Sequence, residues 1–202
     1  MSPRPYSLGK RQAQIDEVRQ QILDATRSLL AESPAYAKFT VDAVARRADV
    51  ARATVYYQFG SKAGLLEALC DHLAVKGGLA EMPEVFTTPD PAAAIRGLVG
   101  VFGRLWDVDR VVMRRLRALA ALDPDVGAVI EARDNRRLTG LGVLVARLGS
   151  EAGSQRDLVR ALYTLSSFEF FDTIAAPGAT LAEAVPQVLG LVDTLLQHTA
   201  PA

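Results

Sequence analysis

Cysteine and histidine are scarce in this chain of 202 residues. The single cysteine, Cys70, excludes an intrachain disulfide and suits a reducing compartment. The two histidines, His72 and His198, are far apart and show no metal-ligand spacing, so we expect no metal and no cofactor. The sequence also lacks an apolar signal core and any run of about 18 apolar residues. We therefore expect a soluble, cytoplasmic protein with no membrane span.

Motifs that mark enzymes or β-sheets are missing as well. There is no G-x-S-x-G, no phosphate-cradling glycine loop and no alternation of apolar and polar residues of any length. A catalytic site built from distant residues would leave no such trace, but nothing in the sequence favours one. Apolar residues instead recur at steps of three and four. The prediction is an all-α protein that is not an enzyme.

The formal net charge is zero, which argues against a protein that coats nucleic acid without specificity. The charge is, however, unevenly divided along the chain. Residues 1–65 hold 10 Lys+Arg and 6 Asp+Glu, and the remaining residues hold 13 and 17, so the two parts carry +4 and −4. This asymmetry is expected when only the front of a protein meets phosphate.

One stretch, from Phe39 to Ala68, has the pattern of three short helices. Thr40 supplies a capping oxygen at the start of the first helix. A break at residues 48–50 separates it from a second helix over residues 51–57, and residues 59–62 break the chain again. The first two helices read as a helix-turn-helix, whose second helix is suited to a DNA major groove.

Side chains on the second helix match the needs of DNA binding. Arg52, Thr54, Tyr56 and Tyr57 offer donors and flat faces, and Ala53 permits close approach of the backbone. Lys62 begins the third helix, after the cap residue Ser61, where a cation and free N–H groups suit a phosphate. Taken alone, the tyrosine pair would more often be ordinary packing residues of an amphipathic helix.

The phrases FTVDAVA, ATVYYQF and GSKAGLLEA together resemble the DNA-binding domain of the TetR family of transcriptional regulators, over about residues 12–75. The resemblance implies a helix-turn-helix domain over residues 10–60, a connecting helix over 61–77, and a helical effector-binding and dimerisation domain over 78–202. It implies a homodimeric repressor that leaves a palindromic double-stranded DNA operator when a small, hydrophobic ligand binds. The expected DNA contacts are Thr40, Arg52, Ala53, Thr54, Tyr56, Tyr57 and Lys62.

Two residues depart from the family pattern. Asp49 stands in the turn where glycine is usual, and Asp tolerates the left-handed backbone. Ala51 stands where a capping Ser is frequent, which removes a hydroxyl and about 1 kcal/mol of capping. A helical interaction module that no longer binds DNA is the alternative, but it predicts loss of the Arg, Thr and Tyr set, which is present.

Flanking segments were assigned from their helical periodicity. We expect residues 1–9 to be disordered, with Arg4, Lys10 and Arg11 forming either a loose DNA-contacting arm or a solvated tail. A long helix over residues 11–32 follows, with an apolar stripe that should pack on the helix-turn-helix. Its stripe consists of Ile15, Val18, Ile22, Ala25 and Leu29.

The remaining residues predict further helices joined by turns. We expect a loop over residues 79–90 and helices over 91–106, 108–121, 123–148 with a break near Gly140 and Gly142, 154–174 opened by a Ser154–Asp157 capping box, and from Thr180 onward with a kink at Pro186. The helix over 108–121 carries four arginines, which we interpret as a solvated or salt-bridged face. These residues are Arg110, Arg114, Arg115 and Arg117.

The last two helices each have an apolar stripe. Two such hairpins would form a four-helix bundle in a dimer, although the stripes would equally complete the core of one chain. The family resemblance favours the dimer. The predicted dimer contacts are Leu158, Leu162, Leu165, Val188, Val192 and Leu195.

The resemblance also implies a ligand pocket between the connecting helix and the dimer helices. The predicted lining is Phe102, Trp106, Met113, Tyr163 and Phe171. The polar groups that we expect to be available there are Trp106, Tyr163, Glu169 and Asp172. His72, on the connecting helix, is interpreted as a polar surface or interface residue.

Overall fold

The computed structural model describes residues 5–32, 39–149 and 152–199. Within these ranges every regular element is a helix, so the all-α prediction is confirmed. The elements are α1 (Pro5–Glu32), α2 (Val41–Arg47), α3 (Arg52–Phe59), α4 (Lys62–Lys76), η1 (Leu79–Glu81), α5 (Met82–Thr87), α6 (Pro91–Asp107), α7 (Arg110–Ala120), α8 (Pro124–Ala146), α9 (Ala152–Leu165), α10 (Phe168–Ile174), η2 (Ala182–Ala184) and α11 (Val185–Thr199).

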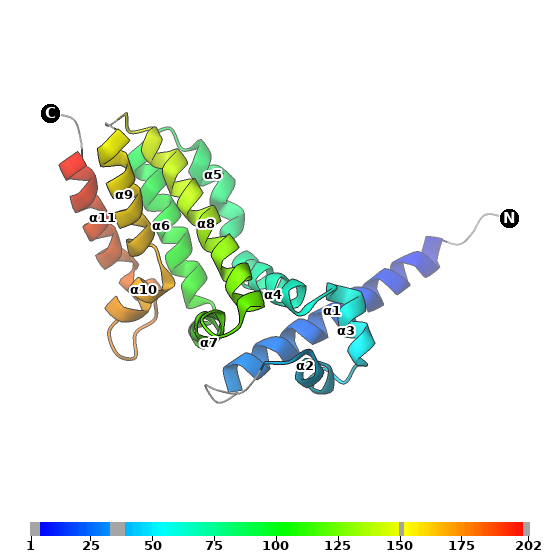
Figure 1. Ribbon diagram of the computed structural model, residues 1–202. Helices are drawn as coiled ribbons and strands as arrows, with labels where there is room; N and C mark the ends of the chain where they lie inside the picture. Colours follow the sequence, from blue (N-terminus) through cyan, green and yellow to red (C-terminus); the bar gives the residue numbers. More distant parts are fainter. Residues whose placement is uncertain (1–4, 33–38, 150–151, 200–202) are drawn as a thin grey trace.

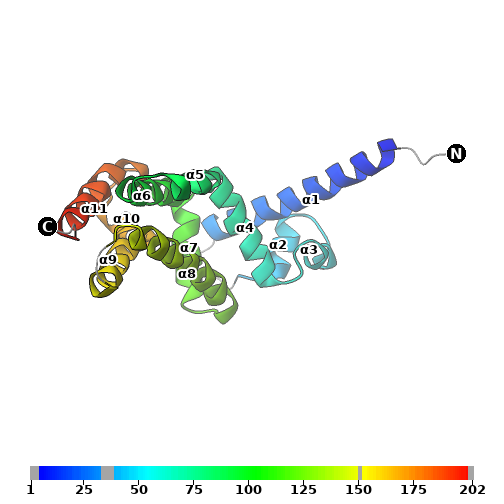
Figure 2. The ribbon, with the colours of Figure 1, turned by 90° about the horizontal axis from the view of Figure 1, so that it is seen from above.

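The helices form a small N-terminal group and a larger C-terminal group, with α4 between them. α1, α2 and α3 lie at one end of the molecule, and α11 lies at the other (Figures 1 and 2). α6, α8, α9 and α11 run alongside one another in the larger group, while α7 crosses below them and contacts α1 (Figure 1). No described helix is both long enough and apolar enough to span a bilayer.

The N-terminal group is built on the apolar stripe of α1. Ile22 and Ala25 are buried, and Val18 and Leu29 pack partly buried against the same cluster, as the periodicity predicts. Polar side chains of α1 add ties to both short helices. Gln21 Nε2 donates to the carbonyl of Ala48, at the end of α2, over 2.8 Å, and Arg19 donates to the carbonyl of Gln58, near the end of α3, over 3.0 Å. A cation at a helix C-terminus also favours the helix dipole.

Two ion pairs join the groups. Arg27 of α1 binds Asp109, the cap residue of α7, and Lys62 of α4 binds Asp123, the cap residue of α8. Both carboxylates also accept backbone N–H groups of the helices that they cap. The position of α1 and α4 is therefore coupled to the first turns of α7 and α8.

Several predicted boundaries are wrong at the ends of α1 and in the loop after α4. α1 begins at Pro5, so residues 5–9, which we expected to be disordered, are helical, and Arg4 lies outside the described residues. The expected loop over residues 79–90 instead contains η1 and α5. α8 runs through Gly140 and Gly142 without a break, because helix packing on both sides outweighs their weak propensity.

The last helices also differ from expectation. Ser154 lies inside α9, which begins at Ala152, and a break at Ser167 caps the separate helix α10. The Thr180–Glu183 capping box is confirmed by reciprocal hydrogen bonds of 3.1 and 3.2 Å, but it opens the 3-10 turn η2. Pro186 is the second residue of α11, where its ring has no earlier α-helical turn to disrupt, so it starts the helix instead of kinking it.

The stripes of α9 and α11 complete the core of a single chain. Leu158 is 4% exposed, and Leu162, Val188 and Val192 are fully buried, because α11 packs against both α6 and α9. These four residues are therefore wrong as dimer contacts. Leu165 and Leu195 are half-buried. α11 comes so close to α6 that a Cβ on Gly103 would lie 2.5 Å from Val185 Cγ2.

Candidate nucleic-acid interface and effector pocket

α3 presents almost all of its side chains to solvent. Val55 is its buried residue, at 1% exposure, and anchors the helix to the core. Tyr57 is 80% exposed and the Arg52 side chain 60% exposed, while Ala53 also faces outward. Packing therefore uses one face of α3 and leaves the predicted reading set on the other, with Tyr56 and Thr54 at its edge.

The turn before α3 has the backbone that the sequence predicts. Thr40 caps α2 by accepting the N–H of Ala43 over 3.2 Å. Asp49 has φ of +50°, which is the left-handed conformation expected where glycine is usual. Ala51 begins α3 without a side-chain cap, so the first N–H groups of α3 are left without that partner.

Arg52 is held across the outer face of α3. Its guanidinium lies 3.2 Å from Asp42 of α2, donates to the Tyr56 hydroxyl over 3.2 Å, and lies over the Tyr56 ring. The hydrogen bond with Tyr56 and the charge of Asp42 raise the pKa of Arg52, so it stays fully charged. The side chain is thus oriented before it meets any ligand.

Lys62 is less free than the sequence suggests. Ser61 caps α4 as predicted, accepting the N–H of Gly64 over 3.0 Å, but Lys62 is only 22% exposed and is paired with Asp123. The hydrogen bond from Lys62 lowers the pKa of Asp123. Asp123 is distant in sequence and did not enter the prediction. Lys62 therefore has a carboxylate as its partner in this conformation, where we expected a phosphate.

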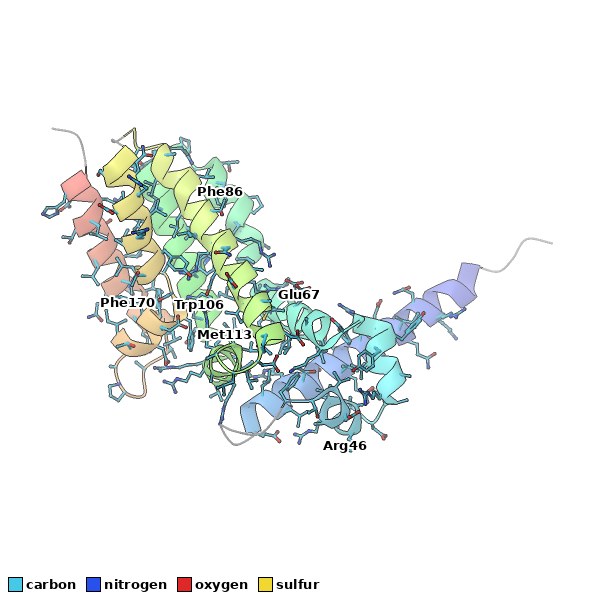
Figure 3. All side chains as sticks on the ribbon, viewed as in Figure 1. Arg46, Glu67, Phe86, Trp106, Met113 and Phe170 are labelled. Carbon is cyan, nitrogen blue, oxygen red and sulfur yellow. The ribbon has the colours of Figure 1, made fainter. Side chains whose placement is uncertain are left out.

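A cavity of about 300 Å³ lies inside the C-terminal group, in the size range of small-molecule sites. Phe102, Trp106 and Met113 line it, as predicted, and Figure 3 shows Trp106 and Met113 within this group. Tyr163 is not a lining residue, and Phe171 is fully buried core beside Gly103. The cavity is lined by Cys70, Leu73, Ala74, Leu79, Met82, Phe86, Leu98, Phe102, Leu105, Trp106, Met113, Arg133, Arg136, Arg137 and Gly140.

The polar groups that we expected to face a ligand are engaged elsewhere. Trp106 Nε1 donates to the carbonyl of Ser166 over 2.9 Å. Asp172 is bound by Arg110 and Arg114, and although burial alone would raise its pKa, these hydrogen bonds lower it. Glu169 is 58% exposed, on the far side of Arg117 from the cavity lining. The prediction for these groups is wrong, because each has a nearer structural partner.

The sequence analysis missed the polar groups that do line the cavity, the three arginines of α8. Arg133, Arg136 and Arg137 follow one another at helical spacing, so they lie on one side of the helix. A signal was present: Arg137 falls on the apolar stripe that contains Ile130, Leu141 and Leu144. A charge on such a stripe indicates burial with partners.

Isolated reactive groups do not form a further site. Burial raises the pKa of the Cys70 thiol, which lines the cavity and is therefore unreactive. Burial also lowers the pKa of His72, which lies on α4 toward α1. Within the part of the chain that the structure describes, no group of three His, Cys, Asp or Glu residues is arranged to hold a metal ion.

Comparison with known proteins agrees with the geometry of α2 and α3. Residues 22–69 match the family model of the bacterial regulatory proteins of the tetR family. The chain is a TetR-family transcriptional regulator. No curated protein matches it.

Solved structures share the fold of the whole TetR-like chain. A transcriptional regulator from Rhodococcus sp. Rha1 is 21% identical, with 91% of this chain and 98% of that chain covered and a TM-score of 0.66. A TetR regulator from Haloarcula marismortui is 19% identical, with 92% and 100% covered and a TM-score of 0.67. The regulator FadR from Bacillus subtilis, in complex with stearoyl-CoA, is 18% identical, with 86% and 96% covered and a TM-score of 0.60.

Proposed function

We propose that this TetR-family regulator is a homodimeric repressor that binds a palindromic operator and is released from it by a small ligand. The outward face of α3, with Arg52 and Tyr57 exposed and only Val55 buried, is the observation that supports this most strongly. In this proposal residues 10–60 bind DNA, 61–77 connect, and 78–202 bind the effector and dimerise. The DNA contacts are those predicted from the sequence, with Lys62 subject to its pairing with Asp123.

The internal cavity supports the ligand part of the proposal. It lies beside α4, and α4 is paired through Lys62 to the start of α8, which also lines the cavity. A ligand that fits only one arrangement of α4 and α8 shifts the position of the two DNA-binding heads. The coupling works in both directions, so operator DNA weakens ligand binding by the same free energy, about 1–3 kcal/mol in typical cases. A TetR-like neighbour solved with stearoyl-CoA is consistent with a ligand of this type.

Arg52→Ala is predicted to relax sequence preference at one base position. Its guanidinium is oriented on the exposed face of α3, and loss of a base-reading arginine costs about 1–3 kcal/mol of discrimination. The measurement is competition between a selected operator and its single-base variants. Arg160→Ala removes an exposed arginine from α9 and serves as the control. Unchanged discrimination in the Arg52 variant contradicts the direct-reading role.

Asp123→Asn is predicted to strengthen binding to all duplex sequences alike, and Lys62→Ala to weaken it alike. Asn retains the helix cap that Asp123 provides, but it no longer holds the ammonium of Lys62. The salt dependence of affinity should fall by about 0.9 per phosphate contact in Lys62→Ala. Glu81→Gln, which neutralises another ion-paired acid, controls for net charge. If Asp123→Asn and Glu81→Gln change affinity equally, Lys62 is not shared between Asp123 and DNA.

The dimer requires a surface other than the buried stripes of α9 and α11. Leu191 of α11 is 42% exposed, and it lies beside Gly190, whose open side allows another helix to approach. Gln187 and Thr194 are exposed on the same helix. α11 also lies at the end of the molecule opposite the DNA-binding group (Figure 2), which leaves both heads of a dimer accessible. We place the two-fold contact on this face.

Leu191→Glu is predicted to weaken dimerisation by at least about tenfold, because an exposed leucine at an interface is replaced by a charge that must be desolvated. Sedimentation over a range of protein concentrations measures the dissociation constant. The control is Val75→Glu, since Val75 is 72% exposed on α4, away from this face. Equal dissociation constants for the two variants contradict this interface, and a wild-type monomer at every concentration contradicts the dimer itself.

A further inference from the structure

The walls of the cavity combine an apolar lining with positive charge alone. Its lining residues are aliphatic, aromatic or sulfur-containing, apart from Arg133, Arg136 and Arg137. No Asp or Glu is among the described residues that line it. Transfer of a guanidinium from water to such surroundings is costly unless a negative charge compensates. The acidic partners of these arginines therefore decide whether the charge is already balanced.

Arg137 is the most buried of the three, with a side chain 1% exposed. One of its terminal nitrogens donates to the carbonyl of Tyr163 over 2.6 Å and to Ser166 Oγ over 2.8 Å. The other lies 3.3 Å from Asp134, and its Nε has no hydrogen-bond partner. The rings of Tyr163 and Phe102 cover the guanidinium, with centroids at 4.2 and 5.5 Å. The side chain is held firmly, yet one donor is left over.

Asp134 does not balance Arg137 on its own. It accepts hydrogen bonds of 2.6 and 3.0 Å from Arg117, a second guanidinium of which only 16% is exposed. The next carboxylate, Glu169, is 58% exposed and lies 3.4 Å from Arg117. Two buried cations thus share one buried anion. Burial lowers the pKa of Arg137, in agreement with this deficit of negative charge.

Arg133 repeats the pattern one turn earlier. It donates to Asp71 over 2.6 Å and to the carbonyl of Glu67 over 2.9 Å, both on α4, and its buried Nε has no partner. Asp71 is 69% exposed, so water screens its charge. Two residues that line the cavity therefore each keep an unused N–H donor, on adjacent turns of α8.

We propose that the effector of this site is a carboxylic acid with an apolar body, bound as its anion by Arg137 and Arg133. This inference rests on the proposed function, in which a ligand occupies this cavity. A carboxylate has the charge that the arginines lack and accepts hydrogen bonds from guanidinium N–H groups in planar geometry. The aliphatic and aromatic walls around Phe86, Leu98 and Met113 cover the apolar body. Contacts of Arg133 with α4 make its response to the anion a direct link to the connecting helix.

The fluorescence of Trp106 tests this on the full chain without DNA, because it is the single tryptophan and lines the cavity. Titrations use decanoate, decan-1-ol and decyltrimethylammonium, which share one tail. We expect decanoate to bind at least about tenfold more tightly than decan-1-ol, the loss expected for a charge-assisted hydrogen bond, and the cation to bind most weakly. Equal or tighter binding of the alcohol or the cation, or no response to any of them, overturns the proposal.

Arg137→Gln isolates the charge from the shape of the cavity. It should weaken decanoate about tenfold and change decan-1-ol less than about threefold, while Arg160→Gln, on the exposed side of α9, changes neither. If thermal unfolding shows that this variant does not fold, Arg133→Gln takes its place with the same expectation. Equal effects on acid and alcohol overturn the proposal, as does tighter binding of decanoyl-coenzyme A than of decanoate.

The DNA-free measurement separates this inference from the proposed function. If decanoate binds as expected but does not release selected operator DNA, the charge complementarity is upheld and release by a ligand at this site fails. If decan-1-ol binds more tightly and releases DNA, the repressor function is upheld and the carboxylate inference fails.

Discussion

A helix that must display its side chains cannot bury many of them, and this constraint shapes the N-terminal group. α3 has eight residues and one buried side chain, Val55, so it is too short and too little buried to be stable by itself. The chain compensates with contacts at its ends. Arg19 of α1 binds the carbonyl of Gln58, and Gly60 ends the helix in a left-handed conformation. α1 therefore serves mainly as a support that keeps the outer face of α3 free.

The same support reaches the C-terminal group through charged residues at helix starts. Asp109 and Asp123 each cap a helix and bind a cation of the N-terminal group, so one carboxylate both ends a turn and joins two parts of the molecule. Close backbone approach fixes α4 as well, because a Cβ on Gly77 would lie 2.5 Å from Leu105 Cα. Movement of α4 thus requires rearrangement at α6 and α8, the helices that line the cavity.

Local features of the fold were predictable because the residues that determine them are close in sequence. The cap at Thr40, the left-handed Asp49 and the outward set on α3 all depend on residues within one or two helical turns. Partners that meet across the fold were not predictable in this way. Lys62 and Asp123 are 61 positions apart, and the stripes of α9 and α11 look the same whether they cover a core or a dimer interface. Arg137 was missed because charged residues on long helices are usually solvated.

The account predicts that two copies of α3, presented by one symmetric dimer, recognise duplex DNA. Selection of bound duplexes from a random pool, followed by sedimentation of the protein on the selected duplex, tests this most directly. The predicted result is a palindrome whose half-site centres are separated by about one helical turn, roughly 34 Å, or a multiple of it, with two chains bound per palindrome. Enrichment of no sequence, or of a single unrepeated half-site that binds one chain, would contradict it.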